Sequence, residues 1–390
     1  MRVLLFAGKG GVGKTSLALA TALGAAQHGH RVCALSTDAA HSLGDALQRS
    51  IGPRPELVAQ NVWAQEVSAL AELERSWASI RDWLRALLFD AERELIQEEL
   101  LVLPGFEELV ALRALREIES SGAYDLCVVD CAPTGAMFRM LRLPEALRAI
   151  MEHFWEWERR AARAVRPFAE RVGLGRFVAP EEVLDAIERL YAEVSDVRRI
   201  LLDEERTSAR LVVNPTRVVI EETRRSFAYL SLYGVATDAL LVNRVLPVEA
   251  AGGYFARWSE RERAELSTIE CCFPLPILRA SLQRREVLGA DALRALACEL
   301  YKDRDPAERL VTQRPLRLDE RDGTLILAID LPTAQRDELH VSLHGDELRV
   351  GMRDVERRIA LPASLAGSAV ASARLSGGVL EVAFAAAPRP

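Results

Sequence analysis

The segment from Gly8 to Thr15 constrains this chain more than any other part of the sequence. Its residues read Gly-Lys-Gly-Gly-Val-Gly-Lys-Thr. An apolar run (3–7) precedes it and a helix-favouring stretch (16–20) follows it, so the segment joins a strand to a helix. Glycines at such a junction let backbone N–H groups turn toward phosphate oxygens, and the helix N-terminus adds partial positive charge. The sequence therefore predicts a phosphate loop, in preference to a glycine-rich turn with an incidental lysine.

Each position of this loop has an expected task. The Lys14 ammonium is expected to contact the β- and γ-phosphates of ATP, and the Thr15 hydroxyl is expected to bind Mg²⁺. ATP and Mg²⁺ are thus the expected substrate and cofactor. The predicted nucleotide-binding positions of the loop are Gly8, Lys9, Gly10, Gly11, Val12, Gly13, Lys14, Thr15 and Ser16.

Lys9, directly after the first glycine of the loop, narrows the class further. A lysine at this position resembles the deviant phosphate loop of the signal-recognition and partition-type ATPases. The resemblance implies that Lys9 reaches across a dimer interface to the nucleotide of the partner. The alternative is a solvated lysine on an exposed loop.

Composition and charge exclude several classes of protein. With 390 residues, 27% of them charged, and a net charge of −7, we expect an acidic, soluble, cytoplasmic protein without the positive field that nucleic-acid binding needs. No apolar run is long enough to span a bilayer, and no signal peptide precedes the first strand. The six cysteines are expected to be buried free thiols. The adjacent Cys271 and Cys272 lack the spacing typical of a zinc chelate.

Strand and helix patterns alternate along the first 300 residues. Strand patterns occupy 31–37, 124–130, 209–213 and 239–242. The alternation predicts a parallel α/β sheet, in which ligands lie beyond the carboxyl ends of the strands.

Two longer segments, 64–120 and 144–206, have helical patterns and are predicted to be insertions. Apolar residues recur at three- and four-residue steps from Trp77 to Leu95 in the first segment. Trp157 lies off the apolar stripe of the second segment and is the candidate for an exposed contact. That second stripe consists of Leu147, Ile150, Met151, Phe154 and Trp155.

Two acidic residues follow predicted strands. Asp38 comes after the strand at 31–37, and Asp130 ends the strand at 124–130. An acid at the carboxyl end of a strand beside a phosphate loop can hold Mg²⁺ or orient the attacking water. Each acid alone could instead be a helix N-cap.

Three motifs together resemble the arsenite-pump and tail-anchored-protein-targeting ATPase family. They are the loop at 8–15, Ser-Thr-Asp-Ala-Ala-His-Ser at 36–42, and Asp-Cys-Ala-Pro-Thr-Gly at 130–135. The resemblance covers residues 1 to about 300. It implies that Asp38 orients the hydrolytic water and contacts Mg²⁺, that Asp130 lies near Mg²⁺, and that Lys9 is catalytic together with Lys14.

Two later segments are similar to the nucleobase side of the site in that family. In Val-Asn-Arg-Val-Leu-Pro at 242–247, the resemblance implies that Asn243 recognises adenine. Pro274 and Leu275, followed by Arg-Glu-Val-Leu-Gly at 285–289, resemble the loop on the adenine side.

The chain departs from the family pattern at several positions. Ala39 replaces the usual proline after Asp38, and Ala136 replaces the usual histidine after Gly135. The Cys-x-x-Cys pair that binds zinc in targeting members is absent, and no three-cysteine metalloid site can be placed. The chain also contains one ATPase core instead of a tandem pair.

The C-terminal part has a different texture, with two-residue alternation from Leu316 to Phe384 and no helical pattern. The stretch from Ala373 to Leu380 resembles the hallmark before the last strand of small heat-shock α-crystallin domains. The expected fold is thus a parallel-sheet P-loop NTPase domain (1–305) with helical insertions, followed by a small all-β sandwich (312–386).

The combined hypothesis is an ATP-hydrolysing homodimer that binds apolar helices of client proteins, with membrane-anchor segments among the candidates. Peripheral association with a membrane remains open, and nucleic acid is not an expected partner. The first alternative is the ATPase subunit of an anion or arsenite exporter. The second is a nucleotide switch in spatial organisation.

Overall fold

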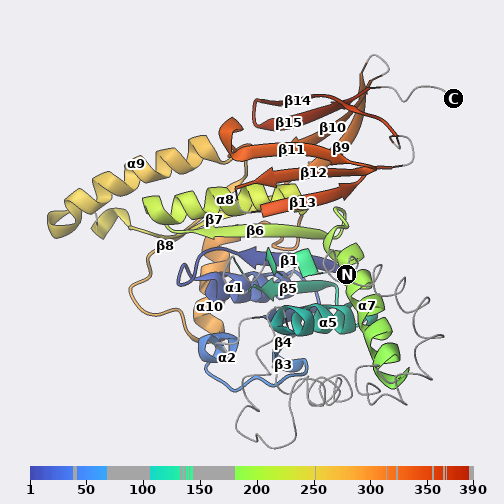
Figure 1. Cartoon of the computed structure of the whole chain (residues 1–390). Coiled ribbons are helices and arrows are strands. Elements are labelled where there is room, and N and C mark those ends of the chain that lie inside the picture. The colour runs from blue at the N-terminus through green and yellow to red at the C-terminus, as the bar shows by residue number, and fades with distance from the viewer. Residues whose placement is uncertain are drawn as a thin grey trace, which may run out of the picture.

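An eight-stranded sheet forms the centre of the N-terminal unit in the computed structural model (Figure 1). The strand order is β3-β4-β2-β5-β1-β6-β7-β8, and every neighbouring pair is parallel except β3 with β4. The strands are β1 (Arg2–Ala7), β2 (Val32–Ser36), β3 (Glu56–Ala59), β4 (Val62–Glu66), β5 (Leu126–Asp130), β6 (Thr207–Val213), β7 (Thr237–Val245) and β8 (Ile277–Ser281). The structure describes residues 1–37, 42–67, 106–131, 135, 138–139, 141–143, 181–250, 252–312, 314–321, 324–353, 355–362, 365 and 367–385.

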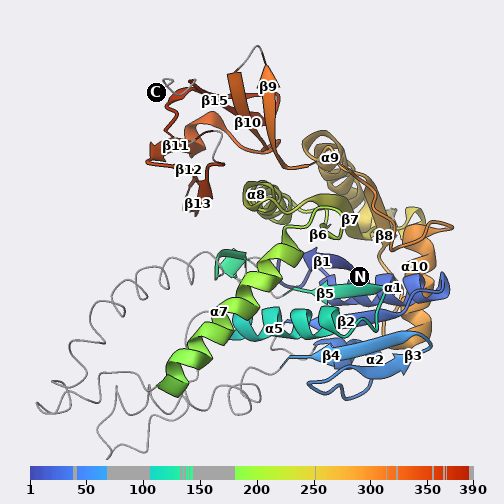
Figure 2. The same ribbon diagram turned by 90° about the vertical axis from the view of Figure 1, so that its right-hand side faces the viewer.

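Helices cover both faces of this sheet (Figure 2). One face packs against α1 (Lys14–Gln27), α2 (Ser42–Leu47) and α10 (Gly289–Tyr301). The other packs against α5 (Phe106–Ser120), α7 (Glu181–Leu201) and α8 (Arg217–Tyr233), with the end of α9 (Ala256–Cys272) beside them. Two short 3₁₀ helices, η4 (Val248–Ala250) and η5 (Gly253–Phe255), precede α9. Within the described residues, no helix is both long and apolar enough to cross a membrane.

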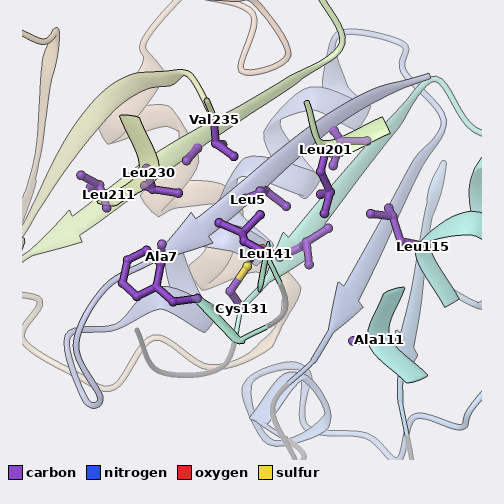
Figure 3. Packing of buried hydrophobic residues seen from close by; sticks show 14 of the residues in the cluster. Leu5, Ala7, Ala111, Leu115, Cys131, Leu141, Leu201, Leu211, Leu230 and Val235 are labelled. Atoms are coloured by element: carbon purple, nitrogen blue, oxygen red, sulfur yellow. Dashed lines mark hydrogen bonds between the residues drawn. The ribbon is translucent and has the colours of Figure 1, made fainter. Parts of the chain in front are cut away.

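The alternation of side chains along β1 shows why its apolar run is continuous. Leu5 and Ala7 pack with α5, α7 and α8, whereas Leu4 and Phe6 pack with α1 and α10. Each of these four side chains is fully buried, because a parallel sheet with helices on both sides shields alternate residues on opposite faces. Figure 3 shows the first of these two clusters, in which Leu5 lies close to Leu141 and Cys131.

The structure corrects the predicted start of the first helical segment. Residues 64–66 lie in β4, which pairs with β3 as an antiparallel hairpin, and neither strand was predicted. The helical prediction is confirmed for α5, and in the second segment for α7. Residues 68–105 and 144–180 lie outside the described residues, and with them the predicted stripes from Trp77 and from Leu147, and also Trp157.

The C-terminal unit consists of two antiparallel sheets, as the alternation predicts (Figure 1). The four-stranded sheet has the order β14-β15-β10-β9, and the three-stranded sheet has the order β11-β12-β13. Their inward-facing residues, such as Leu327, Leu348 and Val382, form one buried cluster. The elements are β9 (Leu316–Arg321), β10 (Thr324–Asp330), η6 (Arg336–Glu338), β11 (Leu339–His344), β12 (Glu347–Met352), β13 (Val355–Ala360), β14 (Val370–Ser376) and β15 (Val379–Phe384).

The C-terminal unit rests on α8. Ala228 and Leu232 of that helix are buried in the same cluster as the β-strands. The Thr333 hydroxyl donates a hydrogen bond to the Arg224 carbonyl (2.8 Å), and the Arg357 guanidinium donates one to the Leu232 carbonyl. The β-unit therefore has apolar and polar contacts with one helix of the N-terminal unit.

The chain between the two units is fixed by a fully buried arginine. Arg210 of β6 donates hydrogen bonds to the carbonyls of Pro306 (2.8 Å) and Glu308 (3.0 Å), and it pairs with the buried Asp238 carboxylate at 3.0 Å. The Tyr301 hydroxyl, 3.1 Å from the same guanidinium, lies 2.6 Å from the Thr21 hydroxyl in α1. Burial alone would lower the pKa of Arg210, but Tyr301 and Asp238 outweigh it and raise that pKa.

Candidate nucleotide-binding site

The glycine-rich segment forms a loop between β1 and α1 whose shape requires its glycines. Gly8 has φ +154°, and a Cβ there would lie 2.5 Å from the Val212 carbonyl oxygen of β6. Gly13 precedes α1 with φ +94°, a left-handed conformation that L side chains rarely adopt. A Cβ on Gly10 or Gly11 would meet nothing within 4 Å, so the outer side of the loop is open. The loop thus has a fixed inner side and an open outer side.

Asn243 supports this loop from the carboxyl end of β7. Its side-chain amide donates a hydrogen bond to the Val12 carbonyl (2.8 Å), and a Cβ on Gly13 would lie 2.3 Å from the same amide nitrogen. The β7–β8 register shifts between Val242 and Val245, and Arg244 has φ +57°. This bulge turns the Asn243 side chain toward the loop and leaves Arg244 exposed. The structure therefore brings Asn243 to the phosphate loop.

Both lysines of the loop have intramolecular partners. The Lys14 side chain is buried, and its Nζ donates to the Lys9 carbonyl at 3.3 Å. The Lys9 ammonium lies 3.3 Å from Glu222 Oε2 of α8. Lys9 is half-buried, whereas the alternative interpretation was a fully solvated lysine on an exposed loop.

Three side-chain oxygens meet beside the start of α1. Thr15 Oγ1 donates to Asp130 Oδ2 (2.6 Å) and lies 3.2 Å from Ser42 Oγ at the start of α2. Asp130 is 2% exposed, and its backbone pairs in register with Phe6 of β1 and Ser36 of β2. Two hydroxyls and a carboxylate are the oxygen donors that Mg²⁺ prefers. The donor set thus fits Mg²⁺.

Residues 38–41, which include Asp38, lie outside the described part of the chain, but both flanking residues are placed. The backbone N–H of Thr37 donates to the Asp130 carbonyl (3.1 Å). On the other side, Ser42 lies beside Thr15. Thr37 and Ser42, the described residues on either side of 38–41, therefore both lie at the cluster of Thr15 and Asp130.

Pro274 and Leu275 are not brought to the loop. They precede β8, and because β8 is parallel to β7, they lie at the opposite edge of the sheet from Asn243. There they line a cavity of about 220 Å³ with Phe227, Thr237 and Pro332.

Leu282 follows β8 at the same edge of the sheet as Asn243, and the sequence interpretation did not single it out. Its N–H donates to the Val245 carbonyl (2.7 Å) at the end of β7. Its side chain is exposed. The end of the apolar strand at Ser281 was the signal that could have identified it.

All six cysteines are free thiols, as expected, but only three of them are buried, so the expected burial was wrong for the other three. Cys33 and Cys127 are register partners in β2 and β5 and are buried, as is Cys131. Burial raises the pKa of Cys33 and that of Cys131 to about 12, so these thiols stay protonated near neutral pH. Cys271 and Cys298 are exposed, and Cys272 is half-buried. Among the described residues, no group of three or more His, Cys, Asp or Glu residues could hold a metal ion.

A strand–loop–helix phosphate site on a helix-covered parallel sheet, with a separate β-sandwich, defines a P-loop ATPase with an appended domain. Comparison with protein families agrees with this class: residues 1–302 match the family described as anion-transporting ATPase. Residues 322–384 match the HSP20-like domain found in these ATPases. The chain belongs to the anion-transporting ATPase family, and the predicted small heat-shock-like domain is confirmed.

Relatives with curated names extend over most of the chain. A protein of Prosthecochloris vibrioformis named as an arsenical pump-driving ATPase is 33% identical, over 94% of this chain and 92% of the relative. A protein of Aquifex aeolicus with a similar name is 30% identical, over 94% of this chain and 95% of its own length. The ATPase GET3B of Arabidopsis thaliana is 29% identical, over 76% of this chain and 78% of the relative. The protein is therefore an ATPase of this family.

Proposed function

We propose that this ATPase works as a homodimer that binds apolar helical segments of client proteins, and that its nucleotide state controls their binding. The geometry around Thr15 and Asp130 is the observation that carries the hydrolytic part of the proposal. The division into an ATPase domain (1–305) and a β-sandwich domain (312–386) belongs to the same proposal.

In this proposal, residues of the loop bind and orient ATP. Backbone N–H groups from Gly8 to Ser16 surround the phosphates, and the Lys14 ammonium neutralises charge on the β- and γ-phosphates. Thr15, Asp130 and Asp38 would hold Mg²⁺, which would supply positive charge to offset the charge of the phosphates. Asp38 orients the attacking water.

The nucleobase side of the proposed site is assigned to Asn243 and Leu282. Asn243 already contacts the loop, and Leu282 continues the same edge of the sheet. A carboxamide can both donate to and accept from an adenine edge. Pro274 and Leu275 are excluded from this assignment by their place at the opposite edge.

The proposed dimer is supported by exposed apolar side chains on the loop side of the sheet. These exposed side chains belong to segments that leave the carboxyl ends of β6, β7 and β8. Figure 1 shows α9 extending outward from this region. Tyr254 is 86% exposed and packs edge to face on Phe255. Exposed apolar groups gathered on one surface are typical of an interaction site. They are Val218, Val248, Tyr254, Phe255, Trp258, Leu282 and Leu288.

The exporter alternative is favoured by one observation, namely the names of the arsenical pump-driving relatives. The buried cysteines do not support this alternative. Trivalent arsenic binds thiolates, whereas Cys33, Cys127 and Cys131 are buried and protonated. The two proposals differ in a direct assay. An exporter subunit should hydrolyse ATP faster when arsenite is added, whereas a client-binding ATPase should not.

The proposed function is tested with a labelled apolar helical peptide in a fluorescence-anisotropy titration. Asp38→Asn chains saturated with ATP should bind the peptide with a different affinity from chains saturated with ADP, and a scrambled polar peptide should bind in neither state. Equal affinity in both nucleotide states would contradict nucleotide control. No binding in either state, together with arsenite-stimulated hydrolysis by the wild type, would favour the exporter.

A further inference from the structure

Glu222 is the only acidic side chain, among the described residues, that the structure pairs with Lys9. It lies on α8, far along the chain from the phosphate loop. The Glu222 side chain is 26% exposed and that of Lys9 is 39% exposed. The ion pair is therefore accessible to solvent and can be exchanged for another pair at small cost.

The position of α8 is set by its own contacts. Two residues beyond Glu222, the Arg224 carbonyl accepts a hydrogen bond from Thr333 of the β-sandwich. Leu232 is buried against the same sandwich. The carboxylate of Glu222 is thus presented to the loop by a helix that is packed on the other domain.

The Lys9 ammonium cannot contact Glu222 and a phosphate of a partner chain's nucleotide at the same time. This ammonium is on Glu222, while the Lys9 carbonyl accepts a hydrogen bond from Lys14 Nζ. A lysine that contacts the phosphates of a partner chain must leave Glu222. Glu222 of the same chain and the phosphates of a partner's nucleotide would therefore compete for the charge of Lys9.

We infer that Glu222 is a positioning residue that holds Lys9 on its own chain until nucleotide and a second copy draw Lys9 away. The inference rests on the proposed role of Lys9 across the dimer. A surface pair contributes little free energy, so we expect the ATP concentration needed for dimerisation to fall roughly two- to fivefold when the Glu222 charge is removed. The turnover of the assembled dimer should not change, because the pair is absent from that state.

The test measures ATP hydrolysis and ATP-dependent dimerisation of full-length Glu222→Gln, with Glu221→Gln as the matched control. Glu221 is the neighbouring carboxylate on α8 and pairs with Arg224, not with Lys9. Glu222→Gln should lower KM for ATP at unchanged kcat and should form dimers at lower ATP concentration. Glu221→Gln should match the wild type in both measurements.

The double variant Lys9→Met/Glu222→Gln separates an effect of the Lys9–Glu222 ion pair from a general effect on α8. The change that Glu222→Gln produces in ATP-dependent dimerisation should vanish in the Lys9→Met background. An equal change in both backgrounds, or a wild-type KM for Glu222→Gln while Lys9→Met is slow, would overturn the inference alone. Wild-type turnover of Lys9→Met itself would overturn the proposed function together with the inference.

Discussion

Thr15 and Asp130 share a hydrogen bond of 2.6 Å between the start of α1 and the end of β5. The hydroxyl and the carboxylate are far apart in the sequence, and the parallel register of β1 with β5 brings them together. Because the same two residues are proposed to hold Mg²⁺, their contact links the fold directly to the chemistry.

The first prediction concerns this pair. Asp130→Asn should keep the hydrogen bond to Thr15 but remove the charge, so ATP hydrolysis should fall at least tenfold. Thermal stability measured in the absence of nucleotide should change little by comparison. Turnover within twofold of wild type, at saturating Mg²⁺, would count against a metal role for Asp130.

The second prediction separates binding from chemistry. Lys14→Ala should abolish ATP binding, because it removes the charge that neutralises the bound phosphates. Asp38→Asn should retain binding and slow hydrolysis, because it removes only the group that orients water. Isothermal titration with ATP and a single-turnover assay measure the two effects. Equal nucleotide affinity of Lys14→Ala and wild type would refute the phosphate-loop assignment.

The third prediction is that Asn243→Ala weakens nucleotide binding at least about fivefold, the factor expected for about 1 kcal/mol per lost hydrogen bond. The Val12 carbonyl would lose its donor, and the adenine contact would be lost as well. ATP should be affected more than GTP if Asn243 reads the base. Parallel titrations with both nucleotides provide the comparison, and an unchanged ratio would remove base recognition from this residue.

The fourth prediction concerns acid stability at the start of β2. Hydrogen bonds from Arg31 lower the pKa of Asp125 from 3.8 to about 2. Since the pKa is lower in the folded chain, the pair stabilises the fold above about pH 3.8, and this contribution is lost as the pH falls toward 2. Both side chains are well exposed, so the contribution is small. Unfolding curves of wild type and Asp125→Asn should differ at pH 6 and converge as the pH falls; a constant difference would contradict this account.

The fifth prediction concerns the β-sandwich. A chain lacking residues 312–390 should remain an ATPase, because the phosphate site lies wholly within the N-terminal unit and Arg210 still holds Pro306 and Glu308. It should suppress aggregation of a thermally unfolding client less well than the full chain. Light scattering of the client with each form measures this. The shortened chain carrying Leu232→Ala is the control for the surface of α8 that the deletion exposes. Superimposable scattering curves would leave the domain a regulatory or structural role.

The parts of the site carried by local patterns were predictable from the sequence. Gly13 and Lys14 stand where a strand passes into a helix, and Asp130 ends an apolar strand, so each could be placed at the correct edge of the sheet. Asn243 was expected near the nucleotide because of the family resemblance, and the structure brings it to the loop.

Other features depend on geometry that a single sequence does not encode locally. The Lys9–Glu222 pair joins segments whose proximity follows only from the packing of α8. The hairpin of β3 and β4 was missed although Asn61, with φ +58°, occupies a two-residue turn that typically marks such a hairpin. Pro274 was assigned to the nucleobase side by resemblance alone, whereas the structure places it before β8, at the opposite edge of the sheet from Asn243.

The central claim is that Lys9 of one chain acts on the ATP bound by its partner. Mixing two variants that are each expected to be inactive tests this claim most directly. Lys9→Ala has an intact phosphate loop, and Lys14→Ala has an intact Lys9. In a mixed dimer, the loop of the first chain receives Lys9 from the second, so the mixture should hydrolyse ATP well above the sum of the separate variants. A mixture no more active than that sum would show that Lys9 does not act on the nucleotide of a partner chain.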